Sequence, residues 1–394
     1  MSGDLLVRRI GRLAPVASPA LDGPCAVLVQ DGVVTYAGPE SGLPPVAGDL
    51  PELDAGGACV IPGFVDAHTH LVWAGSRRAE FAARLAGEKY DGGGIRDTVS
   101  ATRAASDDRL LELAADRATA CLAHGTTTIE VKTGYGLSHA EELRMLRVAG
   151  RLPGAVGLRV ERTYLGAHVV PDGRDPDDYV DEVIATLPEA ASAGAHWCDV
   201  FCDEGAFTVA QARRILAAAG DMGFGLRIHA EELAPSGGAA LAAELGCASA
   251  DHLEHVTPEA AGAMAAAGVV GVLLPSVALS LRSGAWGHAQ VLQQAGVELA
   301  LATDCNPGTS WCESMPYVMQ LACLQMGLSV DEALRAATLG AAHSLRLDQA
   351  GWLGPGSYGD LAVLDAVHEI DVVAHLGSQW TRATVVGGSV LHEF

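Results

Sequence analysis

The sequence lacks the features that place a protein in a membrane or direct it out of the cell. No uninterrupted apolar run reaches the roughly 18 residues that a transmembrane helix needs. The first residues, MSGDLLVRRIGRLAP, carry charges where a secretory signal peptide requires an apolar core. The chain also contains no low-complexity linker and no internal repeat. We therefore expect a soluble, cytoplasmic protein.

Paired cysteines and basic residues are also scarce. The nine cysteines are scattered, odd in number and form no C-x-x-C motif, which is typical of reduced thiols in a cytoplasm. Only 25 residues are Lys or Arg, against 48 Asp or Glu, so the formal net charge is −23. This excess disfavours nucleic acid and anionic membrane surfaces as partners. It still permits an anionic small-molecule substrate, because local arginines can outweigh a distant field.

The chain does contain an alternation of strand-like and helix-like segments from about residue 60 to residue 345. Eight short segments are apolar or β-branched, as strands buried on both faces should be. They are 61–66, 126–131, 158–165, 197–201, 225–229, 248–252, 269–274 and 297–303. Ala-rich helical patterns separate them, such as AEELRMLRVAG and VAQARRILAAAG, the latter ended by Gly220. This predicts an α/β fold, a (β/α)8 barrel of the TIM type, and no G-x-G-x-x-G motif supports the rival doubly wound sheet.

The two ends of the chain have a different pattern. CAVLVQDGVVTYAGP (25–39) is two strand patterns around Asp31-Gly32, and TRATVVGGSVLHE (381–393) is similar around Gly387-Gly388. GDLAVLD (359–365) is a further strand pattern. We expect these ends to supply hairpins and no helix. They should pair into a small β-sandwich domain (1–60 plus 346–394) beside the barrel (61–345).

Polar side chains gather where the expected strands end. PGFVDAHTHL (62–71) places His68 and His70 on one face of an extended chain, with Thr69 turned away. Catalytic groups of such barrels lie at the C-terminal ends of the strands, so these positions predict an active site. The candidates after later strands are Lys132, Tyr135, His168, Asp203, Glu204, His229, Glu232, His252, Asp304 and Asn306.

Four of these residues form a ligand set for a metal. His68, His70, His229 and Asp304 offer three nitrogens and one carboxylate oxygen, which suits one ion of zinc or iron (Zn2+, or Fe2+/Fe3+) with room for a water. The alternatives are a packed core histidine at His229 and a helix-capping role for Asp304. A two-metal site bridged by a modified Lys132 is also conceivable, but a single ion with Lys132 paired to a carboxylate is the simpler interpretation.

The pattern resembles the amidohydrolase superfamily, which shares H-x-H after strand one, His after strands five and six, and Asp after strand eight. More specific segments resemble the imidazolonepropionase family within it. These are EVKTGYGL (130–137), TYLGAHVVP (163–171), DVFCDEGAF (199–207), HAEE (229–232), SADHL (249–253) and ATDCNPGTS (302–310). The resemblance runs along the whole chain. It implies a metal-dependent hydrolase of cyclic amide C–N bonds that converts 4-imidazolone-5-propanoate to N-formimidoyl-L-glutamate in histidine degradation.

The resemblance also implies roles for individual residues in the chemistry. A metal-activated water attacks the ring carbonyl, and Asp304 takes its proton. His252 steadies the oxyanion or shares the proton transfer, and Glu232 binds or protonates a ring nitrogen.

Binding residues follow from the same resemblance. Arg77 should clamp the propionate carboxylate, whereas the adjacent Arg78 should be a surface residue. The pocket walls and the contacts to the polar end of the substrate, partly through backbone N–H groups, are expected from Tyr135, His168, Asn306, Gly308 and Thr309.

Two segments depart from the family pattern. The loop GEKYDGGGI (87–95), expected near the pocket, is short, and LLPSVALSLRSG (273–284) lacks aromatic residues. They leave open a related enzyme that hydrolyses another ring. The sequence also leaves open a deaminase of a small heterocycle and a catalytically inactive binding protein. We expect a homodimer on base rates.

Overall fold

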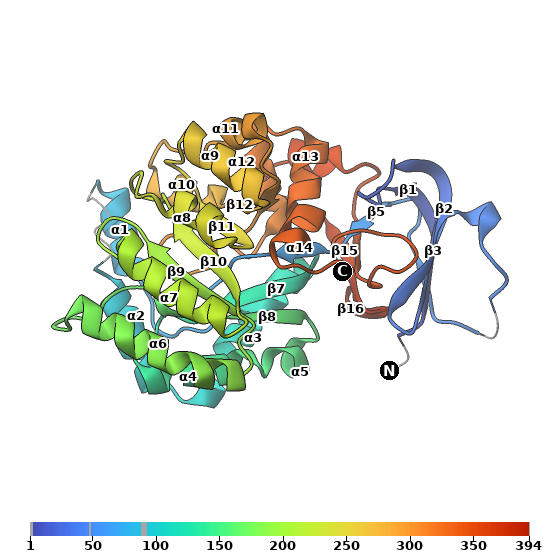
Figure 1. The fold of residues 1–394 in the computed structure, drawn as a ribbon. Coiled ribbons are helices and arrows are strands. Elements are labelled where there is room, and N and C mark those ends of the chain that lie inside the picture. Colours follow the sequence, from blue (N-terminus) through green and yellow to red (C-terminus); the bar gives the residue numbers. More distant parts are fainter. Residues whose placement is uncertain (1–2, 47–48, 88–92, 394) are drawn as a thin grey trace.

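The computed structural model describes residues 3–46, 49–87 and 93–393, and these form a barrel unit and a β-sheet unit side by side (Figure 1). The barrel consists of eight parallel strands that follow one another in chain order. This confirms the predicted barrel. The strands are β6 (Phe64–Asp66), β7 (Thr126–Lys132), β8 (Arg159–Ala167), β9 (Trp197–Cys202), β10 (Gly225–Ala230), β11 (Ser249–His252), β12 (Val270–Leu273) and β13 (Leu299–Leu301).

The barrel is closed by residues just beyond the ends of β6 and β13. Thr69 and Cys305 form an isolated parallel bridge. The N–H of Asp304 donates to the carbonyl of His68, and the N–H of His70 donates to the carbonyl of Cys305, each at 3.0 Å. Three of the four expected metal ligands, His68, His70 and Asp304, therefore lie on the segments that complete the ring of strands.

Helices cover the outside of the barrel (Figure 1). In α7 the side chain of Thr208 and that of Gln211 form a capping box, and the buried residues follow the period of an amphipathic helix. The helix runs one residue past Gly220, so the predicted end at that glycine is wrong by one position. The barrel-unit helices are α1 (Arg78–Leu85), α2 (Ile95–Ala104), α3 (Asp107–Ala123), α4 (His139–Ala149), α5 (Leu152–Val156), α6 (Pro176–Ser192), α7 (Val209–Asp221), α8 (Gly238–Leu245), α9 (Pro258–Ala267), α10 (Pro275–Leu281), α11 (Ala289–Ala295), α12 (Met315–Met326), α13 (Val330–Arg335), the π-helix η2 (Ala336–Gly340) and α14 (Ala341–Ser344).

The first predicted strand is two strands that belong to different sheets. Cys59–Pro62 (β5) pairs in the terminal sheet, whereas β6 pairs with β7 in the barrel. The break falls at Gly63, where a Cβ would lie 2.2 Å from Cγ2 of Thr127. Only glycine fits this close approach. Both strands are fully buried, so their sequence is one continuous apolar run.

Both ends of the chain build one mixed sheet, with strand order β16-β15-β14-β5-β1-β2-β3 and β4 paired to β1. Residues of β1–β3 share a single core with residues of β14 and β15, as the predicted sandwich requires. The hairpin turns at Asp31-Gly32 and Gly387-Gly388 are confirmed, and all four residues have positive φ. The strands are β1 (Leu5–Leu13), β2 (Leu21–Gln30), β3 (Val33–Pro39), β4 (Glu52–Asp54), β5 (Cys59–Pro62), β14 (Leu361–Leu364), β15 (Thr381–Val386) and β16 (Ser389–Glu393).

The two ends of the chain and the loop 87–95 were also the subject of predictions from the sequence. The ends of the chain do contain short helices, η1 (Glu40–Gly42) and α15 (Ile370–Ala374), so the prediction of no helix there is wrong. Of the loop 87–95, residues 88–92 lie outside the described residues. None of the helices within the described ranges has the length and apolar character needed to cross a membrane.

Candidate metal centre and active site

The polar residues expected at the strand ends do gather at one end of the barrel, around a cavity of about 1100 Å³. His68 is fully buried next to His70, and Gly308 lies against Arg77. Asp203 is buried, and its carboxylate accepts the N–H groups of three residues of the surrounding loops. The predicted site residues that line the cavity are His70, Arg77, Tyr135, His168, Glu204, His229, Glu232, His252, Asp304, Asn306 and Thr309.

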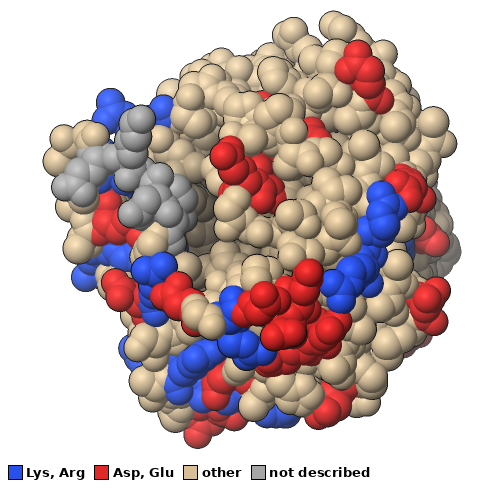
Figure 2. Space-filling model, turned by 60° about the vertical axis from the view of Figure 1, so that its left-hand side comes forward, with Lys and Arg blue, Asp and Glu red and all other residues tan. Residues whose placement is uncertain are grey.

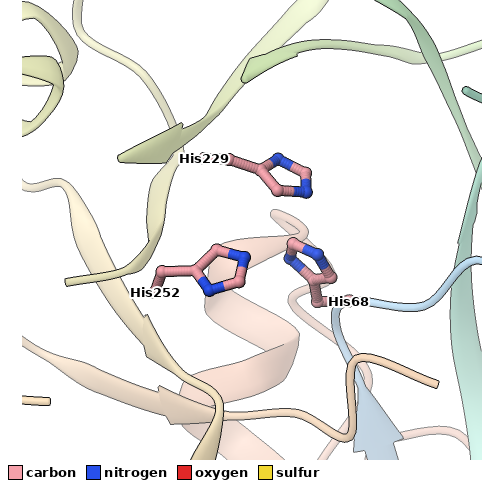
Figure 3. Close-up of side chains that lie close together, drawn as sticks. All are labelled: His68, His229 and His252. Carbon is pink, nitrogen blue, oxygen red and sulfur yellow. The ribbon is translucent and has the colours of Figure 1, made fainter. Parts of the chain in front are cut away.

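Four histidines and one aspartate lie close enough together to hold a metal ion. They form two overlapping triads. Within each triad the three ligand atoms lie within 4.8 Å of one another. One triad is His68, His70 and Asp304, and the other is His68, His229 and His252. Figure 3 shows the second triad, in which three imidazoles point toward one another from the end of β6, from β10 and from β11. The four ligands expected from the sequence are thus divided between the two triads: His68 belongs to both, His70 and Asp304 to the first, and His229 to the second, together with His252.

The donor atoms of this cluster fit a bound cation. His68 Nε2, His229 Nε2 and Asp304 Oδ1 are buried and have no hydrogen-bond partner among the described residues. Asp304 Oδ1 lies 3.5 Å from His68 Nε2 and 3.4 Å from His70 Nε2. Burial of unpaired polar atoms is costly, and nitrogen and carboxylate donors are the ligands that zinc and iron(II) prefer. A transition-metal ion would satisfy all of these atoms.

The opposite nitrogens of two of these histidines are held by buried carboxylates. His68 Nδ1 lies 2.7 Å from Asp251 Oδ2, and His229 Nδ1 lies 3.1 Å from Asp199 Oδ1. Because an ionised carboxylate only accepts, each Nδ1 is the donor and each Nε2 is left with a lone pair for a metal.

Lys132 is fully buried and ion-paired. Its Nζ lies 2.9 Å from Glu130 Oε1 and 2.7 Å from Asp199 Oδ2. Burial alone would lower the pKa of Lys132, but the neighbouring carboxylates raise it above its usual value. The structure therefore agrees with the interpretation in which Lys132 pairs with carboxylates.

Glu232 and Glu254 flank His252 on opposite sides. His252 Nε2 lies 3.7 Å from Glu232 Oε2, and His252 Nδ1 lies 3.8 Å from Glu254 Oε2. Burial and the nearby charge of Asp203 raise the pKa of Glu232 to about 8. Burial and Glu232 raise the pKa of Glu254 well above its usual value. Glu254 was not expected from the sequence. The sequence feature that could have indicated it is its position two residues after His252.

Arg77 is almost fully buried and bound to Glu80. Arg77 Nε and Nη2 donate to both carboxylate oxygens of Glu80 at 2.7 to 3.0 Å. The guanidinium also packs against two glycines, since a Cβ on Gly94 would lie 2.6 Å from Arg77 Nε and one on Gly308 would lie 2.3 Å from Nη1. Arg78 is exposed, as expected. Glu80 was not expected from the sequence, and its signal was an acid three residues after Arg77 on a helix.

Aromatic rings form one wall of the cavity. The rings of His70 and His168 stack with centroids 5.3 Å apart, and Tyr135 lies 5.4 Å from His168. The loop that carries Tyr135 is fixed by Glu142, whose carboxylate accepts three backbone N–H groups of residues 134–137. Three hydrogen bonds to one buried carboxylate make this wall rigid.

The loop after β13 is closed on itself through Asn306. Its Oδ1 accepts the N–H groups of Gly308 and Thr309 at 2.8 Å each, and its Nδ2 donates to the carbonyl of Asp304 and to Thr309 Oγ1. These two N–H groups are therefore bonded within the loop in this structure, and the contact of the loop with the substrate stays a prediction. Asn306 and Thr309 do line the cavity.

Charged side chains on the outer surface form exposed ion pairs, in contrast to the buried ion pairs inside the barrel. Arg214 pairs with Asp177 and Asp181, and Arg213 pairs with Glu244. Figure 2 shows acidic and basic side chains intermixed in a band across one face, beside a broad area with few charges. Exposed ion pairs of this kind contribute little to stability, whereas the buried charges at the end of the barrel must be balanced by one another or by a bound ion.

Comparison with known proteins finds a family model and close relatives that match nearly the whole chain. A model of the amidohydrolase family matches residues 59–391. The chain is 46% identical over 394 residues to an imidazolonepropionase from Salinispora arenicola, which covers 98% of each chain. It is 43% identical over 396 residues to an imidazolonepropionase from Mycolicibacterium smegmatis. That alignment covers 98% of this chain and 97% of the relative.

Solved structures with low sequence identity share the fold. A mutant atrazine chlorohydrolase from Arthrobacter aurescens, complexed with zinc and atraton, has a TM-score of 0.77 at 18% identity and covers 99% of this chain and 95% of that one. An adenosine deaminase from Xanthomonas campestris with bound zinc has a TM-score of 0.74 at 20% identity and covers 98% and 92%. These likenesses concern the arrangement of the barrel and the terminal sheet.

Proposed function

The chain belongs to the amidohydrolase family and functions as an imidazolonepropionase, and we propose that it opens the ring of 4-imidazolone-5-propanoate with the residues gathered at the end of its barrel. The reaction adds one water across the amide C–N bond of the ring and yields N-formimidoyl-L-glutamate. The observation that carries this assignment is the 46% identity that extends over 98% of both chains. The pocket is consistent with it because hydrolytic groups and a buried arginine line one cavity.

We propose that one ion of zinc or iron is held by His68, His70, His229 and Asp304. The unpartnered buried atoms of these side chains support this set. When bound, the ion supplies Lewis acidity that activates a water molecule and polarises the ring carbonyl. Three nitrogens and one carboxylate suit both metals, so metal analysis of the purified protein decides between them.

The side chains around this centre handle the protons. Asp304 faces the cavity and takes a proton from the attacking water. His252, which also lines the cavity, donates a hydrogen bond to the oxygen that becomes negative as the tetrahedral intermediate forms. Glu232, 3.7 Å from His252, delivers a proton to the ring nitrogen as the C–N bond breaks. One proton is taken from water and one is delivered to nitrogen, so the reaction balances.

The propionate tail and the ring are bound by separate parts of the pocket. Arg77 provides a buried positive charge for the carboxylate, and Glu80 holds its guanidinium in a fixed plane. Tyr135 and His168 form the wall against which the ring packs. We assign the polar end of the substrate to the side chains of Asn306 and Thr309, which line the cavity, and to the loop at Gly308 between them.

The experiment that tests this function follows the ultraviolet absorbance of freshly made imidazolone propanoate in the presence of the metal-loaded enzyme. We expect the absorbance to fall and N-formimidoyl-glutamate to accumulate, without release of ammonia. Release of ammonia from a heterocycle, with no ring opening of the imidazolone, would instead identify a deaminase.

We also propose that the enzyme works in the cytoplasm as a homodimer. Each of the nine cysteines carries a free thiol, and eight of them are buried, which suits a reducing compartment. Closed two-fold dimers are the commonest assemblies of soluble enzymes. Light scattering of the purified protein should give twice the 40.5 kDa mass of one chain, and a mass of one chain would contradict the dimer.

A further inference from the structure

A layer of charged side chains fills the interior of the barrel directly next to the metal-binding cluster. Its members come from four strands and are at most 1% exposed. Because side chains alternate along a strand, residues two positions before a ligand share its inward face; Arg227 precedes His229 in this way. The layer consists of Glu130, Lys132, Asp199, Arg227 and Asp251.

This composition is unusual for the inside of a barrel. Such interiors are normally packed with branched apolar side chains. The free-energy cost of removing charged groups from water is often larger than the gain from their mutual attraction. Apolar residues would therefore suffice if the layer served packing alone. A buried charged layer against a reactive centre indicates a task that apolar side chains cannot perform.

Every charge in the layer has a partner in the layer. Lys132 Nζ contacts Glu130, Asp199 and Asp251 at 2.9, 2.7 and 3.6 Å. Arg227 Nη2 donates to Asp251 at 3.2 Å, and its two terminal nitrogens also donate to backbone carbonyls. Lys132 thus lies between the two carboxylates that receive the Nδ1–H groups of His68 and His229: it donates a hydrogen bond to Asp199 and is an ion-pair neighbour of Asp251, which Ser249 Oγ also binds at 2.6 Å.

We propose that Asp251 and Asp199 are positioning residues for the metal-binding histidines, and that Lys132 locks both carboxylates in place so that the Nε2 atoms of His68 and His229 point at one ion. This inference rests on the proposed metal centre and deepens it. The carboxylates fix which ring nitrogen carries the hydrogen and how each ring is rotated, and the ammonium group fixes the carboxylates. The two rings are therefore aligned before an ion binds, and binding need not order them.

The test measures metal release from the zinc-loaded enzyme. Asp251→Asn and Asp199→Asn are compared with the parent enzyme by adding EDTA and following zinc transfer, with the melting temperature of each protein as the measure of folding. We expect release to be about 10 to 100 times faster in both variants, the usual consequence of removing a partner of a ligating histidine. Release within twofold of the parent rate in both variants would overturn the proposal.

Asp360→Asn provides the matched control. Asp360 is a buried carboxylate that binds Arg159 at 2.7 Å and accepts the N–H of Gly387 at 2.7 Å, so its partners among the described residues lie away from the metal-binding histidines. Its substitution should lower the melting temperature and leave metal release unchanged. Equal acceleration in this control would mean that general destabilisation, not histidine positioning, governs release.

A charge-matched double variant keeps the test decisive if the single variants fold poorly. Lys132→Met with Glu130→Gln removes one positive and one negative charge, and it should accelerate zinc release while the protein remains folded. Nitrogen-15 NMR of labelled histidines reports the result independently, because Asp251→Asn should shift the ring signals of His68 and Asp199→Asn those of His229. Unchanged signals in both would contradict the proposal.

These measurements need no substrate, so they test the positioning of the histidines separately from the proposed function. An enzyme that binds zinc as expected but leaves the imidazolone intact would refute the proposed function alone.

Discussion

Adding one methyl group at Gly308 should show whether Arg77 holds the propionate of the substrate. A Cβ at this position would lie 2.3 Å from Arg77 Nη1 and 2.7 Å from Cζ. Favourable nonbonded contacts begin at roughly 3.5 Å, so the guanidinium must move by about 1 Å. Gly308 does not have a positive φ, and the alanine therefore introduces no backbone strain of its own.

The displaced guanidinium has little freedom to accommodate the methyl group. Arg77 is 6% exposed, and Glu80 binds its Nε and Nη2. A binding group that is misplaced by about 1 Å can cost up to about 100-fold in efficiency. We expect Gly308→Ala to raise KM for imidazolone propanoate by about 10- to 100-fold, while the metal content and the melting temperature stay close to those of the parent.

Two controls isolate the effect on the tail. Gly262→Ala places a methyl group on α9 with no atom within 4 Å, and it should leave KM unchanged while stabilising the helix by roughly 0.5–1 kcal/mol. A substrate analogue without the propionate should be turned over equally by the parent and by Gly308→Ala. A parental KM for the full substrate in Gly308→Ala would refute the placement of the tail on Arg77.

Four further predictions concern the site itself. His229→Ala should remove both metal and activity, as checked by metal analysis and absorbance assay; activity in the metal-free variant would contradict the ligand assignment. Arg77→Ala should raise KM by about one to two decades for the full substrate, since a charged hydrogen bond is worth roughly 1.5–3 kcal/mol, with little change for the tail-less analogue. His252→Ala should keep the metal and lose about 10²–10³ in kcat; loss of the metal would make His252 a ligand. Because burial and Asp203 raise the pKa of Glu232 to about 8, its proton is present below that pH and lost above it, so kcat/KM should fall as the pH rises through this value, and Glu232→Gln should abolish that dependence.

The barrel and its two flanking hairpins could be predicted because they depend on local signals. Buried parallel strands are short apolar runs, and Asp31-Gly32 and Gly387-Gly388 match turns that need positive φ. The split of the first strand could not be predicted. It depends on the contact of Gly63 with Thr127, which lies 64 residues away, and both halves of the strand are equally apolar.

The location of the site was predictable for the same reason, since the ends of parallel strands meet at one end of a barrel. The partners of the site residues were not. Glu80, which binds Arg77, and Glu254, which lies beside His252, are each only two or three residues along the chain from a predicted site residue. However, the sequence contains 48 acidic residues, and closeness along the chain alone does not select among them. The pairing of Asp251 with His68 joins residues 183 positions apart, so only the closed barrel brings them together.

Closure of the barrel also brings together the His68, His70 and Asp304 triad. The ring closes where the N–H of Asp304 donates to the carbonyl of His68 and that of His70 to the carbonyl of Cys305. Asp304 has a φ of 47°, a left-handed conformation that costs an aspartate about 1–3 kcal/mol. Its backbone is held there on both sides, because Asn306 Nδ2 donates to its carbonyl. The strain is thus sustained by the bonds that join the first and last strands, and those bonds bring His68, His70 and Asp304 close together.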